Sequence, residues 1–174
     1  NKGNDDGIVQ PCEWVKEPYD YTGFAILTDA QILGDTLPGN AGTGPNGRYE
    51  QEEYVDTPWG ALAQENVDTG GSASDSDFSV PEELGGGTIR RLREGIERFL
   101  ITNINNAAAS ARGQSVVPVM WDHISTKVAD FNHVPGGANI LYLDGHVEFS
   151  RYPGTAFPIT EDSARIFGRY DRPW

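Results

Sequence analysis

Apolar residues recur at helical spacing between Thr88 and Leu100. One face of this segment carries Ile89, Leu92, Ile96, Phe99 and Leu100. The other face is charged and carries Arg90, Arg91, Arg93, Glu94, Glu97 and Arg98. This spacing predicts an amphipathic helix that begins at Thr88. We interpret its arginines as a solvated or partner-facing stripe on an otherwise acidic chain.

A second pattern, near the C-terminus, predicts a β-hairpin. Residues 138–143 are mostly apolar and include a β-branched and an aromatic side chain, and residues 146–149 alternate between polar and apolar. Asp144 and Gly145 stand between the two runs. An Asp-Gly pair in this position is typical of a two-residue type I′ turn, which requires positive φ at both central residues. We therefore expect a tight turn with Gly145 at positive φ.

Shorter elements are indicated by their boundary residues. Thr28 and Gln31 fit a capping box, with Gly34 as the end of a short helix. Thr160 fits the N-cap of a helix over 161–167 that ends at Gly168. Two weaker signals are one helical turn over 59–63 and an edge strand or bulge over 116–120, which Pro118 interrupts. Helices and strands mix without regular alternation, which predicts an α+β fold with an antiparallel sheet.

The chain length indicates one domain, although glycine and proline are frequent. At 174 residues with 21 Gly and 11 Pro, there is room for one compact core surrounded by long loops. The stretches 37–47, 66–79 and 85–87 have the composition of such loops. We expect a single globular domain over 1–174. Its predicted parts are a variable loop-rich part (1–85), a part holding the hairpin (88–155) and a C-terminal tail (156–174).

Charge and composition exclude several classes of function. The chain has 26 acidic against 13 basic residues, a net charge of −13, which argues against binding to nucleic acid or to an anionic membrane surface. No run approaches the roughly 18 apolar residues needed to span a bilayer, and no basic-then-apolar signal opens the chain. The single cysteine, Cys12, excludes an internal disulfide and a multi-thiolate metal site.

The histidines offer one candidate catalytic centre. His133, Asp144 and His146 lie around the predicted hairpin, and imidazole and carboxylate groups are common zinc ligands. Helical His-x-x-x-His spacing is absent, however, and the predicted turn already uses Asp144. The sequence also lacks a nucleophile elbow, a Walker loop, a Rossmann fingerprint and a His-Glu-x-x-His motif. We therefore expect a structural role for these residues and no enzymatic activity.

A calcium site is the second candidate. Acidic residues crowd the stretch between positions 68 and 83, where the ligands would be Asp68, Asp75, Asp77, Glu82 and Glu83. Calcium accepts six to eight oxygen ligands in adaptable geometry, which suits a loop of this kind. The EF-hand template is absent, because its central Gly and its final Glu are missing. A solvated acidic loop remains the alternative.

A resemblance to a known family rests on three stretches: 96–106, 118–122 and 132–149, the last reading NHVPGGANILYLDGHVEF. Together they resemble the His-X9-Asp-Gly domain of bacterial prepilin-type proteins, within the wider set of type IV pilin-like and type II secretion pseudopilin-like subunits. Ten residues separate His133 from Asp144, where the family name specifies nine. The resemblance covers roughly 90–155, and the N-terminal helix of pilins is absent from this chain.

The resemblance implies a pilin-like head domain and a non-enzymatic structural subunit. The filament or secretion system would be extracellular or part of the cell envelope, and the partners would be copies of this chain, related subunits and the assembly machinery. The structural motif would consist of His133, Gly136, Gly137, Asp144 and Gly145. Major pseudopilins carry calcium in a head-domain loop, which adds weight to a calcium cofactor here.

Two other functions remain open. The first is a carbohydrate- or calcium-binding surface module, which predicts that Trp14, Trp59 and Trp174 form one exposed patch. The second is a metal-dependent hydrolase, which predicts that His133, Asp144 and His146 converge within about 2 to 2.5 Å of one metal.

Overall fold

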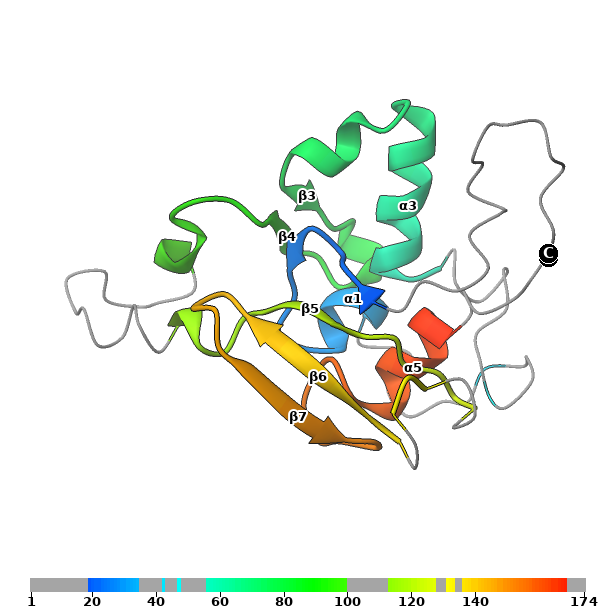
Figure 1. The fold of residues 1–174 in the computed structure, drawn as a ribbon. Helices are drawn as coiled ribbons and strands as arrows, with labels where there is room; N and C mark the ends of the chain where they lie inside the picture. The colour runs from blue at the N-terminus through cyan, green and yellow to red at the C-terminus, as the bar shows by residue number, and fades with distance from the viewer. Residues whose placement is uncertain are drawn as a thin grey trace, which may run out of the picture.

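The computed structural model describes residues 19–34, 42, 47, 56–99, 113–127, 131–133 and 136–168. These residues form an α+β fold with two antiparallel sheets and three α-helices (Figure 1). The predicted class is therefore confirmed at this level. None of the helices in the described ranges has both the length and the apolar character needed to cross a bilayer.

The larger sheet has four strands in the order β1-β5-β6-β7. The strands are β1 (Tyr19–Asp20), β5 (Pro118–Asp122), β6 (Gly137–Tyr142) and β7 (Val147–Arg151). Strands β6 and β7 form the predicted hairpin, with Asn139 opposite Phe149. The hairpin signal in the sequence was therefore sufficient to predict these two strands of the sheet.

The turn of the hairpin is longer than predicted. The amide of Gly145 donates to the carbonyl of Tyr142 at 2.9 Å, and the amide of Tyr142 donates to the carbonyl of His146 at 3.0 Å. These bonds enclose a three-residue loop of Leu143, Asp144 and Gly145, so the predicted two-residue turn is wrong. Gly145 has φ +90°, which confirms its positive φ and fits the left-handed third residue of such loops.

Strand β5 lies inside the sheet, between β1 and β6, so the prediction of an edge strand is wrong. The alternative prediction of a bulge is confirmed, because the pairing with β6 shifts between Pro118 and Met120. Proline has no amide to donate to the ladder, and a bulge is one of the few places where a sheet accepts it.

The smaller sheet has three strands in the order β2-β4-β3. Strand β4 (Thr88–Arg91) lies between β2 (Phe24–Ala25) and β3 (Phe78–Ser79). The helix predicted from Thr88 to Leu100 is therefore wrong. Its first residues form β4, Gly95 has φ +78°, and only a short 3₁₀ turn, η5 (Ile96–Phe99), follows. Pairing with β3 and with β2, which lies far away in the sequence, buries Ile89, and this outweighs the local helical spacing.

Helix α1 (Ala30–Leu33) begins and ends close to the predicted positions. The side chain of Gln31 reaches back, and its Oε1 accepts hydrogen bonds from the amides of Leu27 and Thr28 at 2.7 and 3.2 Å. Gly34 follows the helix with φ +75°, as expected for its end.

The other two helices begin at threonine caps. Helix α3 (Pro58–Asp68) is longer than the single turn predicted, and Thr57 accepts a hydrogen bond from the amide of Gly60 at its start. Helix α5 (Glu161–Phe167) has the predicted bounds, and Thr160 accepts from the amide of Ser163 at 3.0 Å. Between α3 and β4 lie two 3₁₀ turns, η3 (Ser72–Asp75) and η4 (Glu82–Leu84).

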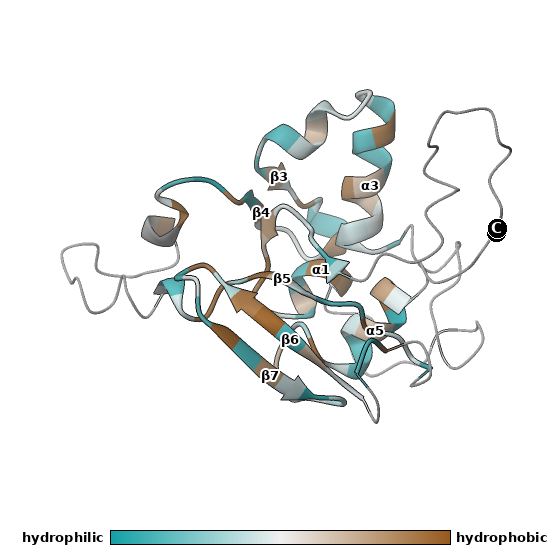
Figure 2. Cartoon of the chain, in the orientation of Figure 1, coloured by the Kyte–Doolittle hydropathy of each residue, from teal (hydrophilic) through white to brown (hydrophobic). Residues whose placement is uncertain are grey.

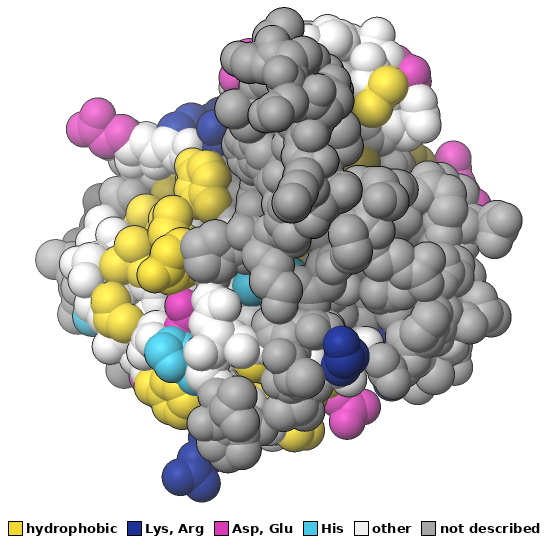
Figure 3. Space-filling model, turned by 45° about the vertical axis from the view of Figure 1, so that its right-hand side comes forward, with side chains coloured by type: hydrophobic (Ala, Val, Ile, Leu, Met, Phe, Trp, Pro, Cys, Tyr) yellow, Lys and Arg dark blue, Asp and Glu magenta, His cyan; other side chains and the backbone are white. Residues whose placement is uncertain are grey.

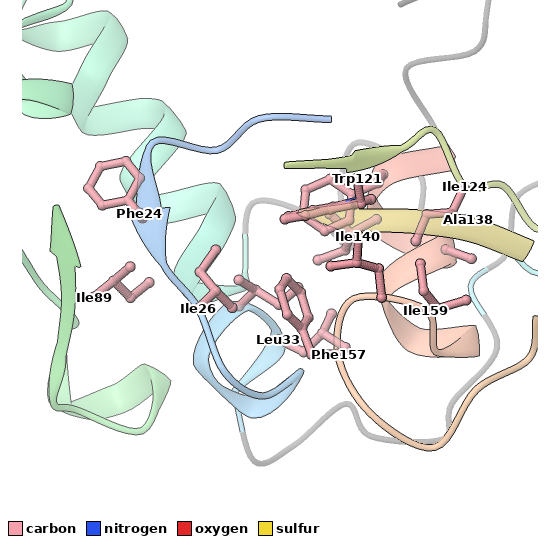
Figure 4. Packing of buried hydrophobic residues seen from close by; sticks show 14 of the residues in the cluster. Phe24, Ile26, Leu33, Ile89, Trp121, Ile124, Ala138, Ile140, Phe157 and Ile159 are labelled. Carbon is pink, nitrogen blue, oxygen red and sulfur yellow. The ribbon is translucent and has the colours of Figure 1, made fainter. Parts of the chain in front are cut away.

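One cluster of buried hydrophobic residues contacts both sheets (Figure 4). Trp121 of β5 lies near its centre and makes edge-to-face contacts with Phe157 and Phe167. Ile140 comes from the brown, hydrophobic stretch of β6 in Figure 2, and Ile89 comes from β4. The described residues of the first and second halves of the chain thus share this core.

Candidate functional site

The motif histidine contacts a buried carboxylate on the neighbouring strand. Nε2 of His133 lies 2.9 Å from Oδ2 of Asp122, the last residue of β5. The same oxygen accepts hydrogen bonds from the backbone amide of Asn139 at 2.7 Å and from its Nδ2 at 2.9 Å. The side chain of Asp122 is only 5% exposed, whereas that of His133 is 47% exposed.

This carboxylate therefore connects β5, β6 and the segment that precedes β6. A buried carboxylate is costly unless hydrogen bonds satisfy it, and Asn139 supplies two of them. Nε2 of His133 lies at ion-pair distance from the same oxygen and also 3.0 Å from Nδ2 of Asn139. His133 belongs to the motif predicted from the sequence, but neither Asp122 nor Asn139 was predicted as its partner. Their only sequence signal was their position within the stretches that carry the family resemblance.

The two motif glycines lie where β6 approaches β7. Gly136 and Gly137 have φ +133° and +153°. A Cβ atom on Gly137 would lie 2.6 Å from Cζ of Phe149 and 2.6 Å from the carbonyl oxygen of Ser150, closer than side-chain atoms pack. The ring of Phe149 also meets His133 edge to face at 6.0 Å. Gly137 thus lets the aromatic ring lie over the strand.

A second histidine–aspartate pair lies at the tip of the hairpin. Nδ1 of His146 is 2.5 Å from Oδ1 of Asp144, and its ring stacks on Tyr142 at 4.4 Å. The side-chain hydrogen bond from His146 is the main reason why the pKa of Asp144 lies below its usual value. His146 thus contacts Asp144 at the hairpin tip, whereas His133 contacts Asp122, so the two histidines have different aspartate partners.

The third histidine lies beside a carboxylate that the sequence did not point to. Nδ1 of His123 lies 3.2 Å from Oδ2 of Asp20, and both side chains are largely buried. Asp20 belongs to β1, which pairs with β5 from the far end of the chain. All three histidines of the chain therefore contact an aspartate on or beside the four-stranded sheet.

Figure 3 shows hydrophobic side chains gathered over this part of the molecule, next to histidine side chains.

The acidic stretch does not assemble around one point. Asp77 accepts a hydrogen bond from the amide of Arg91 at 2.9 Å and forms ion pairs with Arg93 at 2.9 Å and Arg90 at 3.4 Å. Desolvation raises the pKa of Asp77, but these hydrogen bonds and arginine charges outweigh it, so the pKa lies below its usual value. Part of the predicted arginine stripe therefore faces a carboxylate of the same chain.

The other predicted calcium ligands are dispersed. Asp68 accepts a hydrogen bond from Nε2 of Gln64 at 2.9 Å, and Asp75, Glu82 and Glu83 are exposed. In the parts of the chain that the structure describes, no three His, Cys, Asp or Glu side chains gather in a way that could hold a metal ion. This holds for the acidic stretch and for the trio proposed for a hydrolase. A calcium site remains a prediction, and thermal unfolding with calcium and with a chelator tests it.

The tryptophan patch predicted for a carbohydrate-binding module lacks one of its members. Trp59 packs edge to face on Phe24 and Phe167, against the core. Trp14 and Trp174 lie outside the described residues. Trp59 is therefore partly buried and packs α3 against the rest of the fold.

Comparison of the chain with models of known protein families, with curated proteins and with solved structures gave no match.

Proposed function

We propose that this chain is the head domain of a pilin-like or pseudopilin-like subunit, a structural component of a filament or secretion system outside the cell or in its envelope. The observation that carries the proposal is that the motif residues between positions 132 and 149 make contacts that hold the four-stranded sheet together. His133 and Asn139 bind the buried carboxylate of Asp122, and Gly137 permits close packing of β6 on β7. These contacts support a structural role for the motif residues, as the family resemblance implies.

The electrostatics of the chain add a condition for assembly. At a net charge of −13, neighbouring heads repel one another unless salt, divalent cations or local charge pairing offsets the repulsion. Arg90 and Arg93 supply cationic surface, but Asp77 already neutralises part of it. The partners in this proposal are copies of the chain or related subunits, together with the machinery that assembles them.

The test is to locate the natural gene product in its own cells. An antibody raised against the 174-residue domain is applied to filaments sheared from the cell surface, with immunogold labelling of intact cells. We expect labelled filaments or envelope assemblies. An antigen confined to the cytosol would overturn the proposal.

A pair of histidine variants sharpens this test. His133→Ala removes the ring that binds buried Asp122, whereas His146→Ala removes a ring at the exposed hairpin tip. We expect His133→Ala to lower the amount of assembled subunit several-fold, and His146→Ala to leave it near the wild-type level. Equal amounts of assembled protein in both variants would contradict the role assigned to the motif histidine.

A further inference from the structure

Strand β7 has an outer side that no other described strand covers. It stands at the end of the order β1-β5-β6-β7, and Figure 1 shows it at the margin of the sheet. Its side chains are also open to solvent, with Val147 60% and Phe149 50% exposed. An edge strand with exposed apolar side chains is a template for another strand.

The hydrogen bonds of the hairpin show which backbone groups of β7 face outward. At one end the amide of Tyr142 donates to the carbonyl of His146, and at the other the amide of Tyr152 donates to the carbonyl of Gly136 at 3.4 Å. Antiparallel strands alternate between residues that bond to the neighbour and residues that do not. The backbone groups of Val147, Phe149 and Arg151 therefore point away from β6.

We propose that β7 pairs antiparallel with β7 of a second copy of this chain, centred on Phe149. A two-fold axis normal to the sheet then sets Phe149 opposite the partner's Phe149 and Val147 opposite the partner's Arg151. Every outward amide meets an outward carbonyl, so the two sheets join into one continuous sheet of eight strands. The proposal does not depend on the function proposed above.

The side chains of β7 favour this register and this occupant. The two Phe149 residues stand opposite each other at the centre, each with its ring over Gly137 of its own copy, and the aliphatic part of Arg151 lies against the partner's Val147. Moving the centre to Glu148 would set two carboxylates directly opposite each other, which destabilises a strand pair. The strand contains one carboxylate and one guanidinium, so it adds no net charge to the contact despite the acidity of the whole chain.

Charged substitutions at Val147 should change the affinity of the dimer in the opposite direction from that expected from repulsion between the net charges of the two copies. Val147→Glu adds a negative charge to a chain already at −13, but it places a carboxylate opposite the partner's Arg151 twice per dimer. Val147→Lys lowers the net charge but sets an ammonium group opposite that guanidinium. Sedimentation equilibrium at physiological ionic strength should show dimers that are about threefold tighter for Val147→Glu and about threefold weaker for Val147→Lys than for wild type.

Matched controls use Val67, which is 73% exposed on α3, away from β7. Val67→Glu and Val67→Lys make the same charge changes, and general repulsion predicts weaker association for the first and tighter association for the second. A wild-type chain that stays monomeric at every concentration, or Val147 variants that follow the Val67 controls, would overturn the proposal.

A cross-link establishes the register independently. In a Cys12→Ser background, Val147→Cys and Arg151→Cys proteins are oxidised separately and as a mixture. Residues opposite each other in an antiparallel pair are close enough for a disulfide, and residue 147 lies opposite residue 151 of the second copy. In a dimer of one variant alone, the two identical cysteines would lie four residues apart along the paired strands, too far for a disulfide. Dimers formed only in the mixture support the pairing, and a mixture with no more cross-linking than either protein alone contradicts it.

Discussion

The two sheets are stabilised in different ways. In the four-stranded sheet, β5, β6 and β7 have five or six residues each, and a three-residue loop joins the last two. In the three-stranded sheet, two-residue strands flank the four-residue β4 and come from segments far from one another in the chain. The first sheet is tied by the buried Asp122, whereas the second is tied by Asp77, whose side chain is 24% exposed.

The difference indicates which substitutions should lower the stability of each sheet most. The hairpin depends on close backbone approach and on a buried polar contact, and neither adjusts easily to a change of one side chain. The three-stranded sheet depends on the burial of Ile89 and on partly solvated ion pairs, which water can replace. We therefore expect substitutions in the four-stranded sheet to cost more stability than matched substitutions beside the three-stranded sheet.

The largest effect is expected at Gly137. Gly137→Ala places a methyl group 2.6 Å from Phe149 and from the carbonyl oxygen of Ser150, at a φ of +153°. Backbone strain and overlap should together lower the free energy of unfolding by about 3 to 5 kcal/mol, measured by urea denaturation. The control is Gly71→Ala, where φ is +100° but nothing lies within 4 Å of the added methyl group. We expect it to cost about 1 to 2 kcal/mol, and equal costs would contradict a close-packing role for Gly137.

The next effect compares the two aspartates. Asp122→Ala removes an acceptor that binds Asn139 and His133 in a buried setting, and we expect a loss of about 2 to 3 kcal/mol in urea denaturation. Asp77→Ala removes a partly exposed acceptor of the three-stranded sheet, and its loss should be about 1 kcal/mol. A larger loss for Asp77→Ala would reverse the comparison between the sheets.

A smaller effect is expected at the hairpin loop. Gly145 has φ +90°, and nothing lies within 4 Å of an added Cβ atom, so only the backbone conformation opposes a side chain there. Gly145→Val should lower the free energy of unfolding by about 2 kcal/mol, because a β-branched residue disfavours positive φ. Gly145→Asn should recover most of that loss, since asparagine visits this region more readily. Equal stability of the two variants would show that the loop adopts another conformation in solution.

Sequence patterns predicted the elements that neighbouring residues decide. The place of the hairpin turn, the Thr160 cap and the end of α1 at Gly34 all depend on residues within a few positions of one another, although the turn is one residue longer than predicted. The helix predicted over 88–100 failed because Ile89 is buried by β2 and β3, which lie elsewhere in the chain. Gly95, at positive φ inside that predicted helix, was the local sign against it.

The candidate site shows the same limit. His133, Gly136 and Gly137 were identified from the motif, but Asp122 and Asn139 became its partners only when β5 and β6 paired. The carboxylates predicted for calcium share a stretch of sequence, but Asp77 turns to Arg90 and Arg93 on and beside β4. Closeness in sequence therefore did not indicate closeness of side chains.

The smallest effect is a difference in pH dependence between two carboxylates. Burial is the main cause that raises the pKa of Asp29 above 3.8, although Thr160 and Ser163 donate hydrogen bonds to it. A raised pKa in the folded state means that protonated Asp29 stabilises the fold below pH 3.8, and that this contribution is lost as the pH rises through the folded pKa. Asp77 has a lowered pKa, so its contribution is present above pH 3.8 and is lost as the pH falls.

Asp29→Asn and Asp77→Asn test these opposite signs in the same fold. The free energy of unfolding is measured by urea denaturation at several values between about pH 2.5 and pH 6, the range in which perturbed carboxylates titrate. The wild-type value minus the Asp29→Asn value should fall as the pH rises, because only the wild type loses a proton at that site. The wild-type value minus the Asp77→Asn value should rise over the same range, because ionised Asp77 pairs with Arg90 and Arg93. Difference curves of the same sign would show that one of the two carboxylates has a different environment in solution, and a flat curve for Asp29 would mean that water reaches the contact between α1 and α5.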